Sequence, residues 1–363
     1  MFLRNSKFLE EERNAPLLDR NNNYLEGATL EALFERASEW PGLVGATQGY
    51  KVENVGVTNS NRIIMADAER TFLDPTRRKT LVRILSCYEN KFGDYHQGLS
   101  LFSGFLLLTL PEQAVANIAF ALATQSKYIP EYWRAEAVAA ATDAYVWEHL
   151  LQKHFPELAQ CLKSHKVLPE TFCQKWFVAL CVSVLPFSAL FNFFEYFFKQ
   201  GHLYLFKFGL TLVSTFKDQI FKSQDYEIYS FLRFDKDLTK KHIATDDIMI
   251  DVVERAANFQ LVPFDITSVR KDVYEVHLRA RLERARQLQK EAEEESSEDL
   301  SSTNSDDSDD SEGAECASCK ENAPDMWCVP CKKLLCEKCH KAAKGQHKKN
   351  HKVDEDWEKY DKK

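Results

Sequence analysis

Two short motifs carry side chains that suit phosphoryl-transfer chemistry: Ile64-x-x-Asp67-x-x-Arg70-Thr71 and Tyr95-x-Gln97-Gly98. When GTP is hydrolysed, negative charge builds up on the phosphoryl oxygens and a water must be aimed at the γ-phosphorus. The planar, five-donor guanidinium of an arginine suits the first task. A glutamine amide, which accepts a hydrogen bond through its oxygen and donates through its nitrogen, suits the second. The pair Arg70 and Gln97, 27 positions apart, therefore predicts a part in GTP hydrolysis.

A resemblance to a known family rests on the segments IIMADAERTF and DYHQGLSLFSGFLLL. Both resemble the TBC domain of Rab GTPase-activating proteins. The resemblance implies an all-α domain that acts in trans on a Rab-type small GTPase in its GTP-bound state. Such a domain is not itself an enzyme but an activator that contributes catalytic residues to the partner GTPase. It implies that Arg70 is the arginine finger and Gln97 the glutamine finger. Asp67, which helps to position the arginine, and the supporting residues Tyr95 and Gly98 complete the candidate site.

The resemblance extends over about 250 residues, because further segments follow in the family's order, namely 128–132, 147–158, 176–180 and 191–201. Two features depart from the family pattern. Arg36-x-x-x-Trp40 after Gly27 fits the opening motif only loosely. Asp94 stands where the family favours glycine, and a carboxylate there is expected to alter the backbone or to repel phosphate. A catalytically inactive scaffold that binds a GTPase and a second partner is the alternative interpretation.

Length and composition indicate a chain of more than one domain. Its 363 residues allow about two domains of roughly 150 residues each. Charges interrupt the first residues, so no secretory signal is predicted. We expect a cytoplasmic protein without disulfides, which its GTPase brings transiently to endomembranes. We predict five parts: an N-terminal extension over 1–24, the TBC domain with a charged C-terminal helix over 25–290, a disordered acidic linker over 291–315, a zinc finger over 316–352 and a charged tail over 353–363.

Proline spacing predicts a run of helices through the first 290 residues, over 99–110, 112–126, 131–154, 170–183 and 187–200. Residues 176–198 are apolar and long enough to cross a bilayer, with Glu195 as the only charge. Since Pro186 divides this segment, we predict a buried helical hairpin and no transmembrane span. The 25 phenylalanines indicate a large apolar core. Four cysteines with no metal-site spacing are assigned to the same core: Cys87, Cys161, Cys173 and Cys181.

A last long helix is predicted over about 269–294, capped at its start by Asp265 or Thr267. Beyond it, twelve acidic residues and no Lys or Arg lie within 291–315, against a net charge of −8 for the whole chain. Such a tract buries too little apolar surface to offset the loss of chain entropy on folding. The sequence therefore predicts the disordered linker at this place.

Eight potential zinc ligands follow the acidic tract: Cys316, Cys319, Cys328, Cys331, Cys336, Cys339, His347 and His351. Each Cys-x-x-Cys turn can present two thiolates to one metal, and tetrahedral zinc takes four ligands, so the set predicts two zinc ions. Four ligand pairs can be combined into two sites in three ways, and spacing does not choose between them.

The same pattern resembles a B-box zinc finger. The resemblance implies an interleaved arrangement, in which Cys316, Cys319, Cys336 and Cys339 hold one ion and Cys328, Cys331, His347 and His351 hold the other. Nine lysines against three acidic residues make 316–352 basic, but the lysines lack the interleaved aromatics and arginines of a nucleic-acid site. We therefore expect the module to bind an unidentified protein partner and not nucleic acid.

Overall fold

The computed structural model describes residues 30–46, 52, 61–72, 74–182, 184–185, 187–233, 246–301, 316–317, 319, 325–331, 333–342 and 352–354. Several residues used in the predictions lie outside these ranges, namely Gly27, Pro186, His347 and His351. The chain divides into two compact units, Met1–Ala285 and Arg286–Lys363, and each is described by itself.

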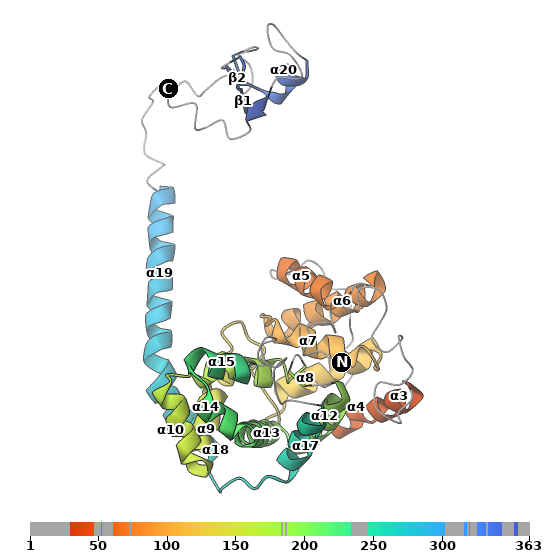
Figure 1. The fold of residues 1–363 in the computed structure, drawn as a ribbon. Coiled ribbons are helices and arrows are strands. Elements are labelled where there is room, and N and C mark those ends of the chain that lie inside the picture. Colours follow the sequence, from red (N-terminus) through yellow and green to blue (C-terminus); the bar gives the residue numbers. More distant parts are fainter. Residues whose placement is uncertain are drawn as a thin grey trace. The chain divides into compact units, whose positions relative to one another are not determined.

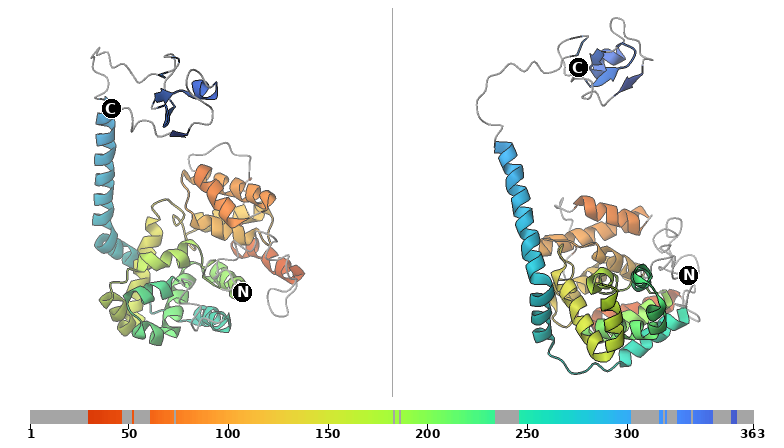
Figure 2. Two further views of the ribbon diagram at one scale, coloured as in Figure 1. Left: turned by 45° about the horizontal axis from the view of Figure 1, so that its top comes forward. Right: turned by 60° about the vertical axis from the view of Figure 1, so that its left-hand side comes forward.

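The first unit is built from helices alone within its described residues (Figure 1). In chain order they are α3 (Leu30–Ser38), α4 (Trp40–Leu43), α5 (Asn61–Thr71), α6 (Pro75–Phe92), α7 (Gly98–Leu106), α8 (Glu112–Thr124), α9 (Val138–His154), α10 (Pro156–Ser164), α11 (Pro169–Cys173), η2 (Gln174–Val178), α12 (Phe187–Gln200), α13 (His202–Thr215), α14 (Lys217–Lys222), α15 (Asp225–Leu232), α17 (Asp246–Asn258), α18 (Ile266–Val273), η3 (Tyr274–Leu278) and the first residues of α19 (Arg279–Ser301), the rest of which belongs to the second unit. The predicted all-α fold is confirmed. Two further views show the orange helices α5 and α6 lying side by side (Figure 2).

Prolines and caps set several helix boundaries. The Asp74 side chain accepts a hydrogen bond from the backbone N of Thr76 at 2.9 Å at the start of α6, and Gly93, with φ of 72°, ends that helix. Pro156 and Pro169 begin α10 and α11. Proline suits the first helical position because its missing N–H has no partner there. The predicted breaks at these two prolines are confirmed.

The predicted helix over 131–154 is wrong at its start, because α9 begins at Val138. Ala137 has φ of 46°, a left-handed backbone conformation that does not continue into a helix. Just before it, the backbone N of Ala135 donates to Asp94 Oδ2 at 2.6 Å. This contact holds the segment against the turn that precedes α7.

The apolar segment 176–198 does not form one helix. η2 ends before Leu180 and Cys181, which have φ of 44° and 59°, and α12 begins only afterwards. Two successive left-handed residues end the helix, so the prediction over 170–183 was too long. No helix in the described ranges is both long and apolar enough to cross a membrane.

The core of the first unit is rich in aromatic rings. Trp40 is fully buried and packs against four phenylalanines, with ring centroids between 5.1 and 6.4 Å away: Phe105, Phe191, Phe194 and Phe198. Cys173 and Cys181 are buried in the same core, as predicted. Cys87 and Cys161 are only half-buried, so assigning them to the core was too strong. The density of phenylalanine in the sequence reflects packing of this core.

The last long helix is capped at one of the two predicted residues, but it begins earlier and ends later than predicted. Asp265 caps α18 by accepting a hydrogen bond from the backbone N of Thr267 at 3.0 Å, and η3 and α19 follow. Since α19 continues to Ser301, the predicted disordered linker is wrong for residues 291–301. Glutamate, which favours helices, recurs there and extends the helix. Residues 302–315 lie outside the described ranges.

The second unit contains β1 (Met326–Cys328), β2 (Lys333–Leu335), α20 (Glu337–Lys341) and β3 (Val353–Asp354). The strands form an antiparallel sheet in the order β2-β1-β3, with Trp327 opposite Leu334. Its buried cluster has six residues, of which four are cysteines; the other two are Met326 and Leu335. So small an apolar core needs a further source of stability, such as a metal.

Candidate functional site

Close packing of α5 on α7 brings the two chemistry-bearing motifs together (Figure 1). Asp67 and Arg70 lie on α5, and Gln97 directly precedes α7. A Cβ atom added to Gly104 would lie 2.6 Å from Thr71 Cγ2, so glycine allows α7 to approach α5 at this point. Residues 27 positions apart in the sequence therefore meet at one place on the surface.

The carboxylate of Asp67 is the centre of the site. It accepts hydrogen bonds from the Tyr95 hydroxyl at 2.7 Å and from Gln97 Nε2 at 3.0 Å, and it forms an ion pair with Arg70. The Asp67 side chain is 1% exposed, whereas the Arg70 side chain is 60% exposed and Gln97 is exposed. A buried anion thus holds a cationic group and an amide, both of which face solvent.

Asp67 was expected beside Arg70, but the contacts of Asp67 with Tyr95 and Gln97 were not predicted from the sequence. Those contacts join residues 28 and 30 positions apart, and no local pattern in the sequence indicates them. Burial first, and then the nearby Asp67 carboxylate, raise the pKa of Tyr95 well above its usual value. The hydroxyl of Tyr95 therefore stays protonated and acts as a hydrogen-bond donor.

Gly98 has a packing role. A Cβ atom there would lie 2.7 Å from Val178 Cγ1 and 2.8 Å from the Val178 carbonyl oxygen. The same carbonyl accepts a hydrogen bond from Trp133 Nε1 at 2.9 Å, which holds it in place. The first residue of α7 must therefore be a glycine if Gln97 is to keep its position.

Asp94, which stands where the family favours glycine, binds backbone groups beside the glutamine motif, and its expected repulsion of phosphate stays a prediction. Its Oδ1 accepts a hydrogen bond from the backbone N of Tyr95 at 2.8 Å, and its Oδ2 accepts one from Ala135 at 2.6 Å. The carboxylate thus binds two backbone N–H groups and fixes the turn before Tyr95.

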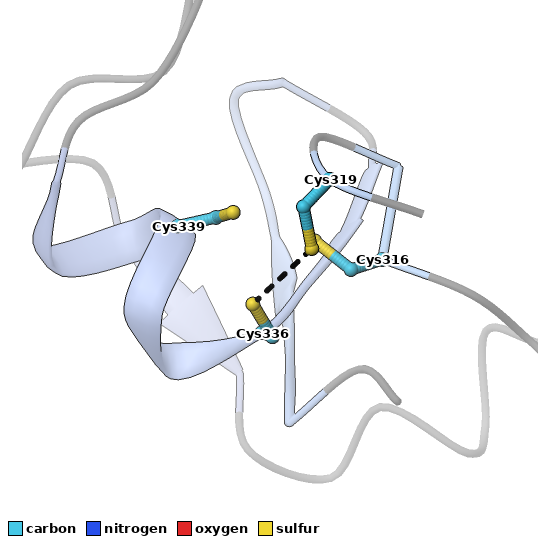
Figure 3. Close-up of side chains that lie close together, drawn as sticks. All are labelled: Cys316, Cys319, Cys336 and Cys339. Carbon is cyan, nitrogen blue, oxygen red and sulfur yellow. Dashed lines mark hydrogen bonds between the residues drawn. The ribbon is translucent and has the colours of Figure 1, made fainter. Parts of the chain in front are cut away.

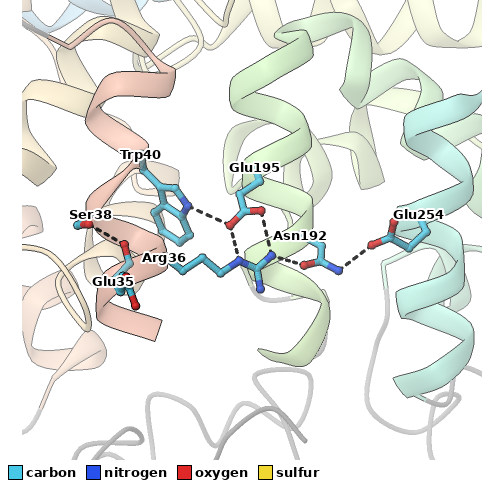
Figure 4. Close-up of polar contacts among 7 residues, drawn as sticks. All are labelled: Glu35, Arg36, Ser38, Trp40, Asn192, Glu195 and Glu254. Carbon is cyan, nitrogen blue, oxygen red and sulfur yellow. Dashed lines mark hydrogen bonds and ion pairs between the residues drawn. The ribbon is translucent and has the colours of Figure 1, made fainter. Parts of the chain in front are cut away.

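The loosely matched opening motif lies in a set of polar contacts that joins four helices of the first unit (Figure 4). Arg36 on α3 pairs with Glu195 on α12 and also donates to Asn192. Trp40 Nε1 donates to Glu195 Oε1 at 3.4 Å, and Asn192 Nδ2 donates to Glu254 on α17 at 2.7 Å. The opening motif therefore helps to hold α3 and α4 against α12.

Four of the predicted zinc ligands converge in the second unit (Figure 3). The sulfur atoms of Cys316, Cys319, Cys336 and Cys339 all lie within 4.8 Å of one another, and those of Cys319 and Cys336 are 3.9 Å apart. Tetrahedral zinc with bonds of about 2.3 Å to sulfur requires sulfur atoms roughly 3.8 Å apart. The donor set therefore fits zinc, and it has the grouping that the B-box resemblance implies.

The second predicted ligand set is only partly described. Cys328 ends β1 and is buried, and Cys331 lies in the turn that follows. The remaining members, His347 and His351, lie outside the described residues. The second zinc ion therefore stays a prediction.

The first unit is a helical domain in which an exposed arginine and an exposed glutamine contact one buried carboxylate, and a small cysteine-rich module follows it. This combination defines a class of protein that can be compared with known families. The family model of the Rab-GTPase-TBC domain matches residues 37–221, and that of the B-box zinc finger matches residues 311–355. The chain belongs to the Rab-GTPase-TBC domain family.

Curated relatives and a solved TBC domain are similar to parts of this chain. Growth hormone-regulated TBC protein 1 of Xenopus tropicalis is 26% identical over 196 residues, which cover 51% of this chain and 56% of that protein. Its namesake of Rattus norvegicus is 27% identical over 198 residues, covering 53% and 67%. The flagellar RabGAP TBC domain of Chlamydomonas has 19% identity and a TM-score of 0.47, covering 70% of this chain and 84% of that one. The chain thus spans only about half to two thirds of the relatives' length.

Proposed function

We propose that the protein is a GTPase-activating protein for a Rab-type small GTPase in its GTP-bound state. Arg70 and Gln97 would enter the partner's nucleotide site in trans, and the GTPase would bring the protein transiently to endomembranes. The observation that carries this proposal is the shared contact of both side chains with the buried Asp67 carboxylate. It presents the two groups that GTP hydrolysis needs at one exposed place.

The geometry gives each group a distinct chemical part. Gln97 donates through Nε2 to Asp67, so its Oε1 is left to accept a hydrogen bond from the attacking water. The Arg70 guanidinium has five donors, and its pairing with Asp67 leaves others for phosphoryl oxygens. Because Asp67 fixes both side chains before the partner arrives, less orientational freedom is lost in reaching the transition state.

Single-turnover GTP hydrolysis over a panel of Rab-type GTPases tests the proposal. We expect Arg70→Ala to lower the stimulated rate by ~10³ to 10⁵, and Gln97→Ala to lower it strongly as well. Arg70→Lys keeps the charge but loses the planar fork, so it should recover little. Arg62→Ala, which removes another exposed arginine of α5, is the matched control. Stimulation by Arg70→Ala equal to wild type would overturn the proposal and favour a non-catalytic scaffold.

For the second unit, we propose that it binds two zinc ions and then acts as a protein-interaction module. The four converging thiols support the first ion, and the pattern of Cys328, Cys331, His347 and His351 supports the second. Metal analysis of the purified chain should give about two zinc ions per chain. A value near one would restrict the proposal to the described four-cysteine site.

A further inference from the structure

We propose that His96 is a positioning residue for Gln97: its ring caps the first turn of α7 and so leaves the Gln97 amide available to the site. This inference rests on the proposed GTPase-activating function and deepens it. His96 is the residue between Tyr95 and Gln97 in the glutamine motif, and it is half-buried.

Two contacts of His96 satisfy backbone groups at the start of α7. The backbone N of Gly98 donates to His96 Nδ1 at 3.0 Å, and the backbone N of Leu99 donates to the His96 carbonyl at 3.0 Å. The first N–H groups of any helix lack partners within the helix and need acceptors from elsewhere. His96 supplies two acceptors, one from its side chain and one from its backbone.

The side chain of Gln97 is not part of the cap of α7. It makes no capping hydrogen bond and reaches Asp67 instead, and the Gln97 backbone, with φ of −53° and ψ of −30°, is already helical. Since the ring of His96 supplies the acceptor for the backbone N of Gly98, the start of α7 is capped without the amide of Gln97.

The cap depends on the protonation state of the ring. Nδ1 accepts a hydrogen bond only in neutral histidine, with the proton on Nε2, and protonation turns both nitrogens into donors. Burial lowers the pKa of His96, while the carboxylates of Asp94 and Asp67 act in the opposite direction. The neutral ring and its cap are therefore present at neutral pH, and because burial lowers the pKa they are lost only at a pH below the ordinary histidine value of about 6.5.

An asparagine at this position offers a matched substitution. Its Oδ1 occupies the place of Nδ1 on the same Cγ, and asparagine commonly binds the N–H two residues ahead in this way. His96→Asn therefore keeps the acceptor for Gly98 without a group that titrates. His96→Leu keeps an apolar side chain of similar reach but removes the acceptor.

The test is single-turnover GTP hydrolysis, with the rate of the GTPase alone subtracted, from about pH 5.5 to 8. We expect His96→Leu to lower the maximal rate about tenfold at neutral pH, the effect of one lost hydrogen bond. The protein concentration that gives half-maximal stimulation should change little. His96→Asn should recover most of the rate. The stimulated rate of the wild type should fall at acid pH, whereas that of His96→Asn should not.

Several outcomes would overturn the inference. One is a His96→Leu variant as active as wild type, and another is a His96→Asn variant as impaired as His96→Leu. The third is a fall in the stimulated rate at acid pH that persists unchanged in His96→Asn. Arg70→Ala, measured in parallel, distinguishes a failure of the His96 inference from a failure of the proposed function. If Arg70→Ala abolishes stimulation and His96→Leu does not reduce it, the His96 inference alone fails. If Arg70→Ala has no effect, the proposed function fails.

Discussion

The two sites of this protein are held together by different means. The arginine and glutamine site is built on a large apolar core, and the Asp67 carboxylate collects its side chains through hydrogen bonds that the folded chain itself provides. The zinc site gathers four thiols around a buried cluster of only six residues. The first site is therefore a product of folding, whereas in the second site we expect metal binding and folding to be coupled.

Removal of zinc is expected to give the largest effect. Structural zinc contributes on the order of 10 kcal/mol to the folding of small modules, so chelation should unfold the second unit. Amide hydrogen exchange of residues 325–342 should lose its protection, while the activation of GTP hydrolysis persists. Cys316→Ser should act like the chelator, and Cys87→Ser, in the first unit, is the matched control. Protection that survives without metal would contradict the coupling of folding and zinc binding.

Asp67→Asn is expected to come next. Three donors converge on the Asp67 carboxylate, and an amide would replace one acceptor oxygen by a donating NH₂ group. We expect a loss of about 2 kcal/mol in the free energy of unfolding and at least a tenfold fall in the stimulated rate.

The control for this change is an exposed aspartate in a comparable pair. Asp251 and Arg255 form an ion pair on the surface of α17, and such pairs contribute less than about 1 kcal/mol. Asp251→Asn should therefore leave both the unfolding midpoint and the rate close to wild type. Equal effects of the two substitutions would show that Asp67 does not organise the site.

The sequence indicated the candidate members of both sites and, through the B-box resemblance, the grouping of four of the cysteines, but it did not indicate the contacts around Asp67. Arg70, Gln97 and the cysteine ligands were found because their types and spacing are specific to one chemistry. The convergence of Tyr95 and Gln97 on Asp67 depends on how α7 packs on α5, which is a tertiary contact and leaves no local pattern.

The predicted start of one helix was wrong for a related reason, whereas the helix predicted over 187–200 is confirmed. The start of α9 is delayed where Ala135 bonds to Asp94, a contact between residues 41 positions apart. In contrast, the cap of α18 at Asp265 depends on a neighbour two residues ahead and was predicted from the sequence. A helix cap can be predicted from the sequence because its partners are close along the chain. Long-range contacts that override helix propensity cannot be predicted in this way.

The smallest expected effect on the stimulated rate concerns the packing that holds Gln97 in place. In Gly98→Ala, the new Cβ would meet both the side chain and the backbone of Val178, and that backbone is held by Trp133. We expect a loss of about 1–3 kcal/mol in the free energy of unfolding, measured by denaturant titration, with a modest fall in the stimulated rate as Gln97 shifts. Gly42→Ala is the matched control, since its Cβ would meet no atom within 4 Å. If Gly98→Ala were as stable as Gly42→Ala, the start of α7 would be free to adjust, and the glutamine site would be less rigidly built than its hydrogen bonds indicate.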